Sequence, residues 1–529
     1  SKILVLREID NYQKAREFFK PKLEDIHSPF LMADMQKAVE RIASAIENGE
    51  KILVYGDYDV DGTTAVALMY LYLSKIVSKK YLDFYIPDRN LEGYGISDEG
   101  INYAKENNYS LIIALDCGIK AIDKIDYANS LGIDFIICDH HLPGDELPKA
   151  CAVLDPKRSD CRYPYKELSG CGVGFKLCQG LNTIYKIPES ELFDLTDLLA
   201  ISIAADIVAM TGENRVLAKL GLKTLRKTRN LGLRLLIPQE KISTFDISNI
   251  VFEIAPKINA AGRISHGKAA VKLMISENLK QAHEIVGDIL DLNDSRRELD
   301  TNITISATNQ VIETNQEKNC STIVYHPEWN KGVIGIVASR LTEVYYKPTL
   351  VFTDGNNGEM VASARSVSDF DVYEALDLCS EYFLKFGGHQ AAAGLSMEKD
   401  KFEDFKIKFE KIVSEKIQEH QKVPSISIDT TIEIEDLNRD FFNFHRKLAP
   451  FGPHNMKPVL ELKNQKVSGY VKTMGKDGGH LKFYIHQPVS GRNIECIGFK
   501  LGEYMEDFKT KSFDLAFTVE ENHWKGNVT

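Results

Sequence analysis

One stretch, residues 51–75, decides the fold, and it reads KILVYGDYDVDGTTAVALMYLYLSK. Residues 51–56 form an apolar, β-rich run of strand length, whereas residues 63–75 carry apolar side chains at helical spacing. Between them lie three alternate carboxylates, closed by Gly62, and these are Asp57, Asp59 and Asp61. Carboxylates this close together repel one another strongly unless a cation lies among them. The stretch therefore predicts a strand–turn–helix unit with a cation site in the turn.

The kind of cation follows from the ligand atoms. Oxygen ligands alone favour a hard divalent ion such as Mg²⁺ or Mn²⁺. A solvated acidic turn is the simpler alternative, and a calcium loop is the sharper one, because the three aspartates and Gly62 match the start of its D-x-D-x-D-G pattern. That pattern requires Glu where this chain has Leu68, and a helix rather than a strand leads into it. We therefore favour a catalytic metal site on an α/β sheet.

The composition is that of an ordinary globular protein. The 529 residues are 43% hydrophobic and 27% charged, enough for about two to four domains. Nine scattered cysteines without a CxxC pair argue against zinc sites and disulfides, and they fit a reducing cytoplasm. The longest strongly apolar run, residues 198–210, is too short to span a bilayer. A net charge of −11 argues against coating nucleic acid by charge alone, but it allows an enzyme with a local basic path.

Further apolar runs follow the first unit, and helical patterns separate most of them. The runs are residues 81–86, 111–115, 135–138 and 152–154. Strands that alternate with helices predict a mainly parallel, doubly wound α/β sheet. In such sheets, ligands bind at the carboxyl ends of the strands.

Two of these predicted strands are followed directly by an aspartate, as the first one is. Asp116 follows one buried run, and the triplet Asp139, His140 and His141 follows another. Because the carboxyl ends of parallel strands meet at one edge, we expect these side chains to converge with the first acids. Asp206 is a further candidate, since a carboxylate within an apolar helix requires a metal or a partner. The alternatives are a helix-terminal acid that faces solvent and an ordinary core or surface pair of histidines.

Four motifs, taken in order, closely resemble those of the DHH phosphoesterase superfamily: GDYDVDGTT, LDCGI, CDHH and AADIVAM. Downstream blocks narrow the resemblance to the bacterial RecJ family of single-strand exonucleases. They are APKINAAGRISHG (255–267), EWNKGVIGIVASRL (328–341), SARSV (363–367) and FGGHQAAAG (386–394). The resemblance covers almost the whole chain. One departure is Asn330, which stands where we expect His in the family and cannot titrate near neutrality.

The resemblance implies an α/β protein in four parts. They are a DHH catalytic domain with a helical N-terminal preface (1–276), a long connecting helix (277–318), a DHH-associated substrate-binding lobe (319–420) and an OB-fold β-barrel for nucleic acid (421–529), expected to be incomplete at its C-terminus. The residues agree with this division. Residues 277–315 lack proline and have apolar residues at helical spacing, and the segment from residue 424 is β-rich with glycine turns.

The resemblance also implies a metal centre for Mn²⁺ or Mg²⁺ that holds two ions about 3.5–4 Å apart. The implied ligands are Asp57, Asp59, Asp61, Asp116, His140 and Asp206, with Asp57 bound either directly or through another group. Asp116 is expected to bridge the ions and Asp139 to orient His140. His141 is expected to contact the scissile phosphate.

The implied substrate-binding residues lie downstream. They are Asn259, Arg263, Ser363, Arg365, Ser366, Gly388 and His389. We expect Arg263 to lie in a glycine-flanked turn and to bind phosphate through both guanidinium arms. The glycines before His389 would let backbone amides approach an anion. For Trp329, stacking on a base and filling a core both remain open.

The function that the resemblance implies is metal-dependent hydrolysis of single-stranded DNA by an exonuclease, in recombination and repair. It further implies 5′ to 3′ polarity, nucleoside 5′-monophosphate products, and a cytoplasmic monomer that works with single-strand-binding protein and a helicase, not a membrane. One alternative is a DHH phosphodiesterase for nanoRNA or cyclic dinucleotides, but such a chain would end near residue 416. The other is a catalytically inactive single-strand-binding relative, but such a chain would have lost the acids that are retained here.

Overall fold

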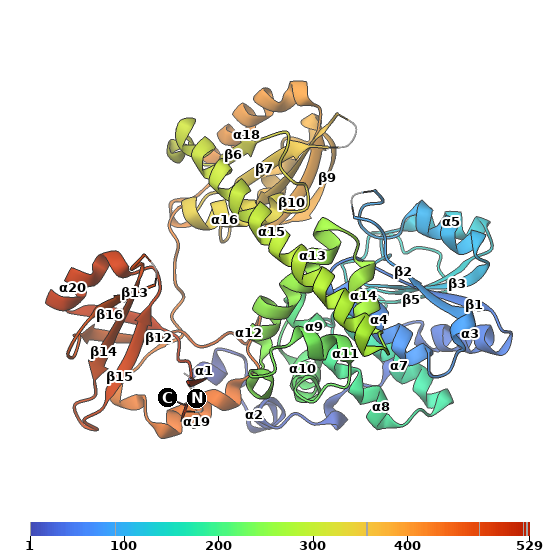
Figure 1. Cartoon of the computed structure of the whole chain (residues 1–529), viewed down its shortest axis with the longest axis horizontal. Helices are drawn as coiled ribbons and strands as arrows, with labels where there is room; N and C mark the ends of the chain where they lie inside the picture. The colour runs from blue at the N-terminus through green and yellow to red at the C-terminus, as the bar shows by residue number, and fades with distance from the viewer. Residues whose placement is uncertain are drawn as a thin grey trace.

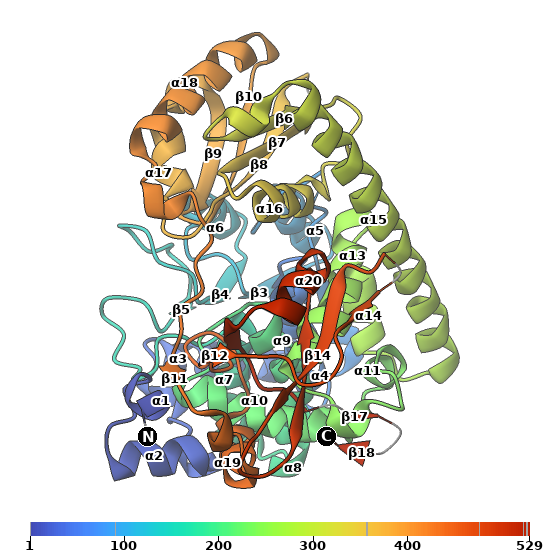
Figure 2. The ribbon, with the colours of Figure 1, turned by 90° about the vertical axis from the view of Figure 1, so that its left-hand side faces the viewer.

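The computed structural model describes residues 2–521, except residues 90, 356, 357 and 476, together with the backbone of residues 523–524 and 527–528. In Figure 1 the first domain lies at the lower right, the second lobe at the top and the β-rich C-terminal domain at the lower left. A long helix, α15 (Leu279–Glu313), runs from the first domain to the second lobe. Figure 2 shows the same helix along one side of the molecule.

The first domain is built on a five-stranded sheet in which every pair of neighbours is parallel, in the order β2-β1-β3-β4-β5. The strands are β1 (Lys51–Gly56), β2 (Leu82–Tyr85), β3 (Tyr109–Leu115), β4 (Asp134–Cys138) and β5 (Ala152–Leu154). The predicted apolar runs therefore form the predicted sheet.

Both faces of this sheet are covered, because successive side chains of a strand point to opposite sides. Ile52 and Val54 of β1 pack in one buried cluster with α3 (Met35–Glu47), α4 (Val60–Leu73) and α7 (Gly170–Tyr185). Leu53 and Tyr55 pack in a second cluster with α5 (Asp98–Glu106) and α6 (Ile122–Ser130). The doubly wound arrangement is confirmed.

The helix after β1 begins three residues earlier than predicted. Asp59 is the N-cap of α4, and its carboxylate accepts a hydrogen bond of 2.9 Å from the Gly62 amide. A Cβ at Gly62 would lie 2.5 Å from the Asp57 carbonyl oxygen, so only glycine permits this tight entry into the helix. As a result, Asp61 lies in the first turn of α4 rather than in a loop.

Helices complete the first domain beyond its sheet. They are α8 (Glu189–Asp194), α9 (Thr196–Ala205), α10 (Gly212–Leu225), α11 (Leu231–Leu236), α12 (Ile247–Asn249), α13 (Ala255–Ile264) and α14 (Lys268–Met274). The connecting helix α15 then begins two residues after the predicted start at residue 277. Among the described residues, no helix combines the length and the apolar character that crossing a lipid bilayer requires.

The second lobe has a five-stranded sheet in the order β6-β7-β8-β10-β9. Its elements are β6 (Thr322–Tyr325), α16 (Ile334–Tyr345), β7 (Thr349–Asp354), β8 (Met360–Arg365), α17 (Val372–Asp377), β9 (Phe383–His389), β10 (Ala392–Met397) and α18 (Phe402–Lys416). Trp329 is 8% exposed and packs with Val333 and Val337 in a core cluster between α15 and this lobe. It therefore fills a core.

The C-terminal domain has two three-stranded sheets, β11-β12-β16 and β13-β14-β15, and a short terminal pair. The elements are β11 (Thr430–Thr431), α19 (Arg439–Leu448), β12 (Leu460–Gln465), β13 (Lys472–Met474), β14 (His480–His486), β15 (Asn493–Gly498), α20 (Met505–Thr510), β16 (Phe513–Phe517), β17 (His523–Trp524) and β18 (Asn527–Val528). Gly475 and Gly478, both with positive φ, form the predicted turn between β13 and β14.

The N-terminal preface packs against the C-terminal domain. Ile3 of α1 (Lys2–Val5) shares a buried cluster with Leu448 and Leu460, and Phe18 of α2 (Tyr12–Phe19) packs against the same cluster. Residues at the two ends of the sequence therefore form one core. Local sequence patterns give no sign of this contact.

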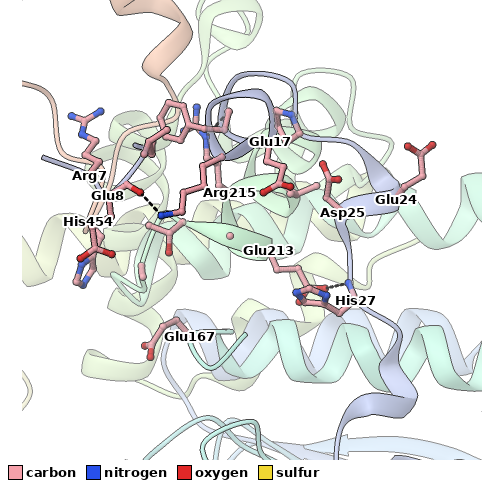
Figure 3. Close-up of a pocket in the computed structure, with 18 of the residues that line it drawn as sticks. Arg7, Glu8, Glu17, Glu24, Asp25, His27, Glu167, Glu213, Arg215 and His454 are labelled. Carbon is pink, nitrogen blue, oxygen red and sulfur yellow. Dashed lines mark hydrogen bonds between the residues drawn. The ribbon is translucent and has the colours of Figure 1, made fainter. Parts of the chain in front are cut away.

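Arg215 of α10 strengthens this junction. Its guanidinium lies 3.8 Å from the centre of the Phe18 ring and donates to the carbonyl oxygens of Phe18, Pro450 and Ala449. Burial lowers the pKa of Arg215 to about 10. Figure 3 shows Arg215 with Arg7 around a pocket of about 980 Å³, and none of the predicted site residues lines this pocket.

We predict that Arg215→Ala destabilises the protein by roughly 2–4 kcal/mol, because it leaves several carbonyl oxygens without their donor. Urea unfolding measures this loss. Lys223→Ala, which removes an exposed cation from the same helix, is the matched control. If both variants unfolded at the same urea concentration, the junction would not depend on Arg215.

Candidate metal centre and phosphate-binding residues

The carboxyl edge of the first sheet gathers the predicted acids around one histidine. The Nε2 atom of His140, which follows β4, lies 3.2 Å from Oδ1 of Asp116, which follows β3. The same atom lies 3.5 Å from Oδ2 of Asp206 and 3.9 Å from Oδ2 of Asp61. Asp206 is the C-cap of α9, and its side chain is 25% exposed and turned toward the acids. Four separate elements thus meet at this point.

Asp61 is held in place by directed donors. The amides of Gly170 and Cys171, at the N-terminus of α7, donate to its two oxygens at 2.7 and 2.9 Å. The Ser202 hydroxyl on α9 donates to Oδ1 at 2.7 Å. A helix N-terminus also carries a partial positive charge that favours a carboxylate. These contacts fix Asp61 in one orientation.

Other atoms at this edge are buried without such donors. Among the described residues, no hydrogen bond reaches Oδ1 of Asp57, Oδ1 of Asp116 or either ring nitrogen of His140, although Nε2 of His140 lies 3.2 Å from Oδ1 of Asp116. Each buried polar atom without a partner costs about 1–3 kcal/mol. Two groups, Asp116–His140–His141 and Asp61–His140–Asp206, have ligand atoms within 4.8 Å of one another. Carboxylate oxygens with imidazole nitrogens suit Mn²⁺ or Mg²⁺, so the residues fit the predicted cation.

The acids raise one another's pKa values. Burial and the charge of Asp61 raise the pKa of Asp116 well above its usual range, and burial and Asp59 do the same for Asp57. Burial, with the charges of Asp61 and Asp59, raises the pKa of Asp206 to about 9. Burial lowers the pKa of His140, so its ring is neutral near pH 7, as a metal ligand must be. A bound cation would restore the carboxylates to their charged form.

The prediction that Asp139 orients His140 is wrong. Oδ1 of Asp139 accepts a hydrogen bond from the ring Nδ1 of His141 at 2.7 Å and from the His141 backbone amide at 3.2 Å. His140 donates to it only through its backbone amide, not through its ring. Although burial opposes both changes, the pairing of Asp139 with His141 lowers the pKa of Asp139 to about 2 and raises that of His141. The reason is that the backbone turn after β4 points the two rings in different directions. The His140 ring faces Asp116, whereas the His141 ring faces Asp139.

Asp116 reaches its position through unusual backbone geometry. Its φ is +60°, a left-handed value that L-residues rarely adopt, and it is buried against the N-terminus of α7. A Cβ at Gly170 would lie 2.5 Å from Oδ1 and 2.8 Å from Cα of Asp116. A glycine at residue 170 is therefore required for Asp116 and Asp61 to lie side by side.

We predict that Gly170→Ala weakens Mn²⁺ binding at least about tenfold, because it displaces Asp116. Calorimetric titration with Mn²⁺ measures the affinity. Gly172→Ala on the same helix is the matched control, because its Cβ would meet no atom closer than 3.4 Å. Equal affinities of the two variants would contradict the assignment of Asp116.

Without metal, the stability of the protein should fall as the pH rises. The pKa of Asp206 is about 9 when folded and about 3.9 when unfolded, so the folded state binds the proton more tightly. Its contribution to stability is complete below about pH 4 and is lost as the pH rises to about 9. Urea unfolding in chelator at about pH 5, 7 and 9 should show that Asp206→Asn reduces this loss.

The control for that series is Asp126→Asn, which removes an exposed carboxylate from α6. It should leave the slope of stability against pH unchanged. A slope that Asp206→Asn also left unchanged would show that the carboxylates do not repel one another in the folded protein.

Arg263 lies in the last turn of α13, so the prediction of a glycine-flanked turn is wrong. Residue 262 of this helix is glycine because a Cβ there would lie 2.7 Å from the Tyr58 carbonyl oxygen. Arg263 donates to the Gly332 carbonyl oxygen of the second lobe at 3.2 Å. Burial and the charges of Arg89, Arg296 and Arg365 lower its pKa to about 10. Cations that crowd one another in this way favour the binding of an anion.

Arg365, at the end of β8, is one of the cations near Arg263, and we call Arg89, Arg263 and Arg365 the basic surface between the lobes. It donates to the Ser363 hydroxyl at 2.9 Å, and a Cβ at Gly335 would lie 2.9 Å from its Nη2. Ser366 instead donates to the Phe370 carbonyl oxygen, which is a structural contact. Asn259 is half-buried on α13, one turn before Arg263.

Gly388 and His389 lie on β9, at the edge of the second sheet. Gly388 has φ +157°, and a Cβ there would lie 2.4 Å from the Ala392 carbonyl oxygen, so the hairpin requires glycine. The His389 side chain is exposed, and its ring nitrogen accepts the Ala391 amide at 3.3 Å. The role of these two residues in binding the substrate stays a prediction.

Sequence reasoning missed three side chains beside the metal centre. The Tyr94 hydroxyl lies 3.4 Å from Nε2 of His141, and the Arg89 guanidinium lies over the Tyr58 ring at 5.1 Å. Arg89 and Tyr94 belong to the loop after β2, which reads PDRNLEGYG over residues 87–95. An arginine, a tyrosine and two glycines in one loop after a strand of the same sheet were the available signal.

Comparisons with known proteins identify related domains in three successive segments of the chain. The N-terminal domain of the DHH family matches residues 51–203, the DHHA1 domain residues 318–415 and the RecJ OB domain residues 428–529. The single-stranded-DNA-specific exonuclease RecJ of Escherichia coli (strain K12) is 30% identical over 94% of this chain and 89% of that protein. The protein of the same name from Bacillus subtilis (strain 168) is 37% identical over 99% of this chain, which spans 65% of that protein.

A solved structure shares the whole fold. The crystal structure of RecJ in complex with Mn²⁺ from Thermus thermophilus has a TM-score of 0.83 and 25% identity to this chain, and the match covers 100% of this chain and 74% of that one. A second structure, of exonuclease RecJ bound to manganese, has a TM-score of 0.64 and covers 74% of this chain.

Proposed function

This chain belongs to the RecJ family, and we propose that it is an exonuclease that hydrolyses single-stranded DNA with Mn²⁺ or Mg²⁺ as its cofactor. The observation that carries the proposal is the set of buried carboxylate and imidazole atoms without hydrogen-bond partners at one sheet edge, which includes Asp57, Asp116 and His140. Relatives named single-stranded-DNA-specific exonuclease, and RecJ crystals with Mn²⁺, support the reaction and the ion.

We propose that the metal ligands are the residues that converge at this edge: Asp57, Asp59, Asp61, Asp116, His140 and Asp206. Bound divalent ions would neutralise the phosphate and lower the pKa of a bound water. The protein contributes by fixing the orientation of these ligand side chains. The α7 amides and Ser202 fix Asp61, and the left-handed φ of residue 116 aims Asp116 at His140.

His141 has a different role in this proposal. Asp139 accepts its Nδ1 proton and raises its pKa, so the ring carries positive charge more readily than a free histidine. Nε2 then faces the Tyr94 hydroxyl at the rim of the site. From there it can donate a hydrogen bond to the phosphate that is cut.

The basic surface between the lobes would bind the phosphates of the strand. Arg263 and Arg365 approach it from the two lobes, Arg89 from the loop after β2, and exposed His389 lies on the second lobe. Bidentate arginine contacts read the backbone but not the base sequence. The C-terminal domain would hold the distal strand by stacking its bases, at about 1–3 kcal/mol per base.

Finer features also belong to the proposal. We infer 5′ to 3′ polarity, nucleoside 5′-monophosphate products, work in recombination and repair beside single-strand-binding protein and a helicase, and a monomeric protein of the cytoplasm. We also infer the four-part division at residues 276, 318 and 420. The packing of α1 and α2 on the C-terminal domain adds that the preface joins the first part to the last.

The assay compares 5′-labelled single strands with blunt duplex, closed circular single strands and a cyclic dinucleotide, each with Mn²⁺. We predict mononucleotide release from linear single strands and rates at least about a hundredfold lower for the other three. Asp116→Asn, purified in parallel, controls for contaminating nucleases and should be inactive. Rapid cutting of circles would indicate an endonuclease, and preferred hydrolysis of the dinucleotide would indicate a small-substrate phosphodiesterase.

A further inference from the structure

Ile207, which directly follows Asp206, has a strained backbone. Its φ is +58°, in the left-handed region, where a β-branched side chain is a genuine outlier. Among the described residues other than glycine with positive φ, Ile207 is the one with a β-branched side chain. Such strain persists only where the surrounding structure enforces it, and it concentrates at functional sites.

The position makes this choice of residue more unusual. Asp206 is the C-cap of α9, and the next residue in a left-handed conformation commonly ends a helix and is usually glycine. Glycine would adopt this conformation without strain. The isoleucine side chain is also 68% exposed, so packing does not compensate for the strain. Neither backbone conformation nor packing therefore explains why residue 207 is isoleucine.

A second exposed apolar side chain lies beside the same centre. Leu142 directly follows His141 and is 70% exposed. Nε2 of His140, two residues before Leu142, lies 3.5 Å from Oδ2 of Asp206, so the segments that carry Leu142 and Ile207 both border the metal centre. Single exposed apolar residues are ordinary, but these two flank a candidate metal centre from two different elements.

We propose that Ile207, together with Leu142 on the segment that carries His140, forms an apolar contact for the base of the nucleotide whose phosphate lies at the metal centre. This inference rests on the proposed function, because the acids and His141 would hold only the phosphate. A base presents a flat apolar face whatever its identity, so an aliphatic contact suits an enzyme that removes every nucleotide in turn. When substrate is bound, the free energy gained by burying Ile207 against the base would offset the cost of the strained backbone.

The test uses Ile207→Gly and Ile207→Asn, because both residues tolerate the left-handed conformation. In chelator, the melting temperature of each variant should equal or exceed that of the wild type, and Mn²⁺ affinity by calorimetry should be unchanged. The KM for linear single strands should rise about tenfold or more with little change in kcat. Lys186→Gly is the matched control, because Lys186 is an exposed, left-handed C-cap on α7.

A strand whose terminal nucleotide is abasic isolates the base. On this substrate the wild type and Ile207→Gly should have the same KM within about twofold, because the contact is absent from both. A difference that persisted on the abasic strand, or a wild-type KM for Ile207→Gly on normal strands, would overturn the inference. If the wild type failed to cut single strands at all, the proposed function would fail instead.

Discussion

The close approach of several aspartates at one sheet edge is the constraint on which the rest of the structure depends. Asp61, Asp116 and Asp206 each have an oxygen within 3.9 Å of one histidine nitrogen. Ligand oxygens of Asp61 and Asp206 therefore lie within 4.8 Å of each other, and like charges this close in a buried site repel strongly. The fold offsets part of this repulsion with the amides of α7, which donate to Asp61. The oxygens of Asp57 and Asp116 that lack donors are left for a cation.

The basic surface between the lobes has an excess of positive charge, whereas the sheet edge has an excess of negative charge. Burial and the charge of Arg89 lower the pKa values of both Arg263 and Arg365. Tyr58 joins the two clusters, because it lies between Asp57 and Asp59 in the sequence, packs under Arg89 and contacts α13. A bound polyanion together with divalent cations would neutralise both clusters at once. Neither ligand alone would do so.

Local patterns predicted much of the fold and most of the candidate site. Alternating apolar runs placed β1 to β5, and acids at strand ends predicted the convergence of Asp116 and His140 because parallel strands end at one edge. The start of α4 was predicted three residues late, since it depends on how Asp59 caps the helix. The partner of Asp139, the helical position of Arg263 and the contacts of Arg215 depend on contacts across long stretches of sequence, which no local pattern contains.

The central claim is that these acids are close together because they hold divalent cations. Anomalous diffraction from crystals soaked in Mn²⁺ tests it most directly. The account predicts anomalous peaks among Asp61, Asp116, His140 and Asp206, with unchanged backbone at Gly170 and Asp116. A well-ordered structure in saturating Mn²⁺ with no peak at this edge, or with the acids bound to lysine or arginine side chains instead, would contradict it.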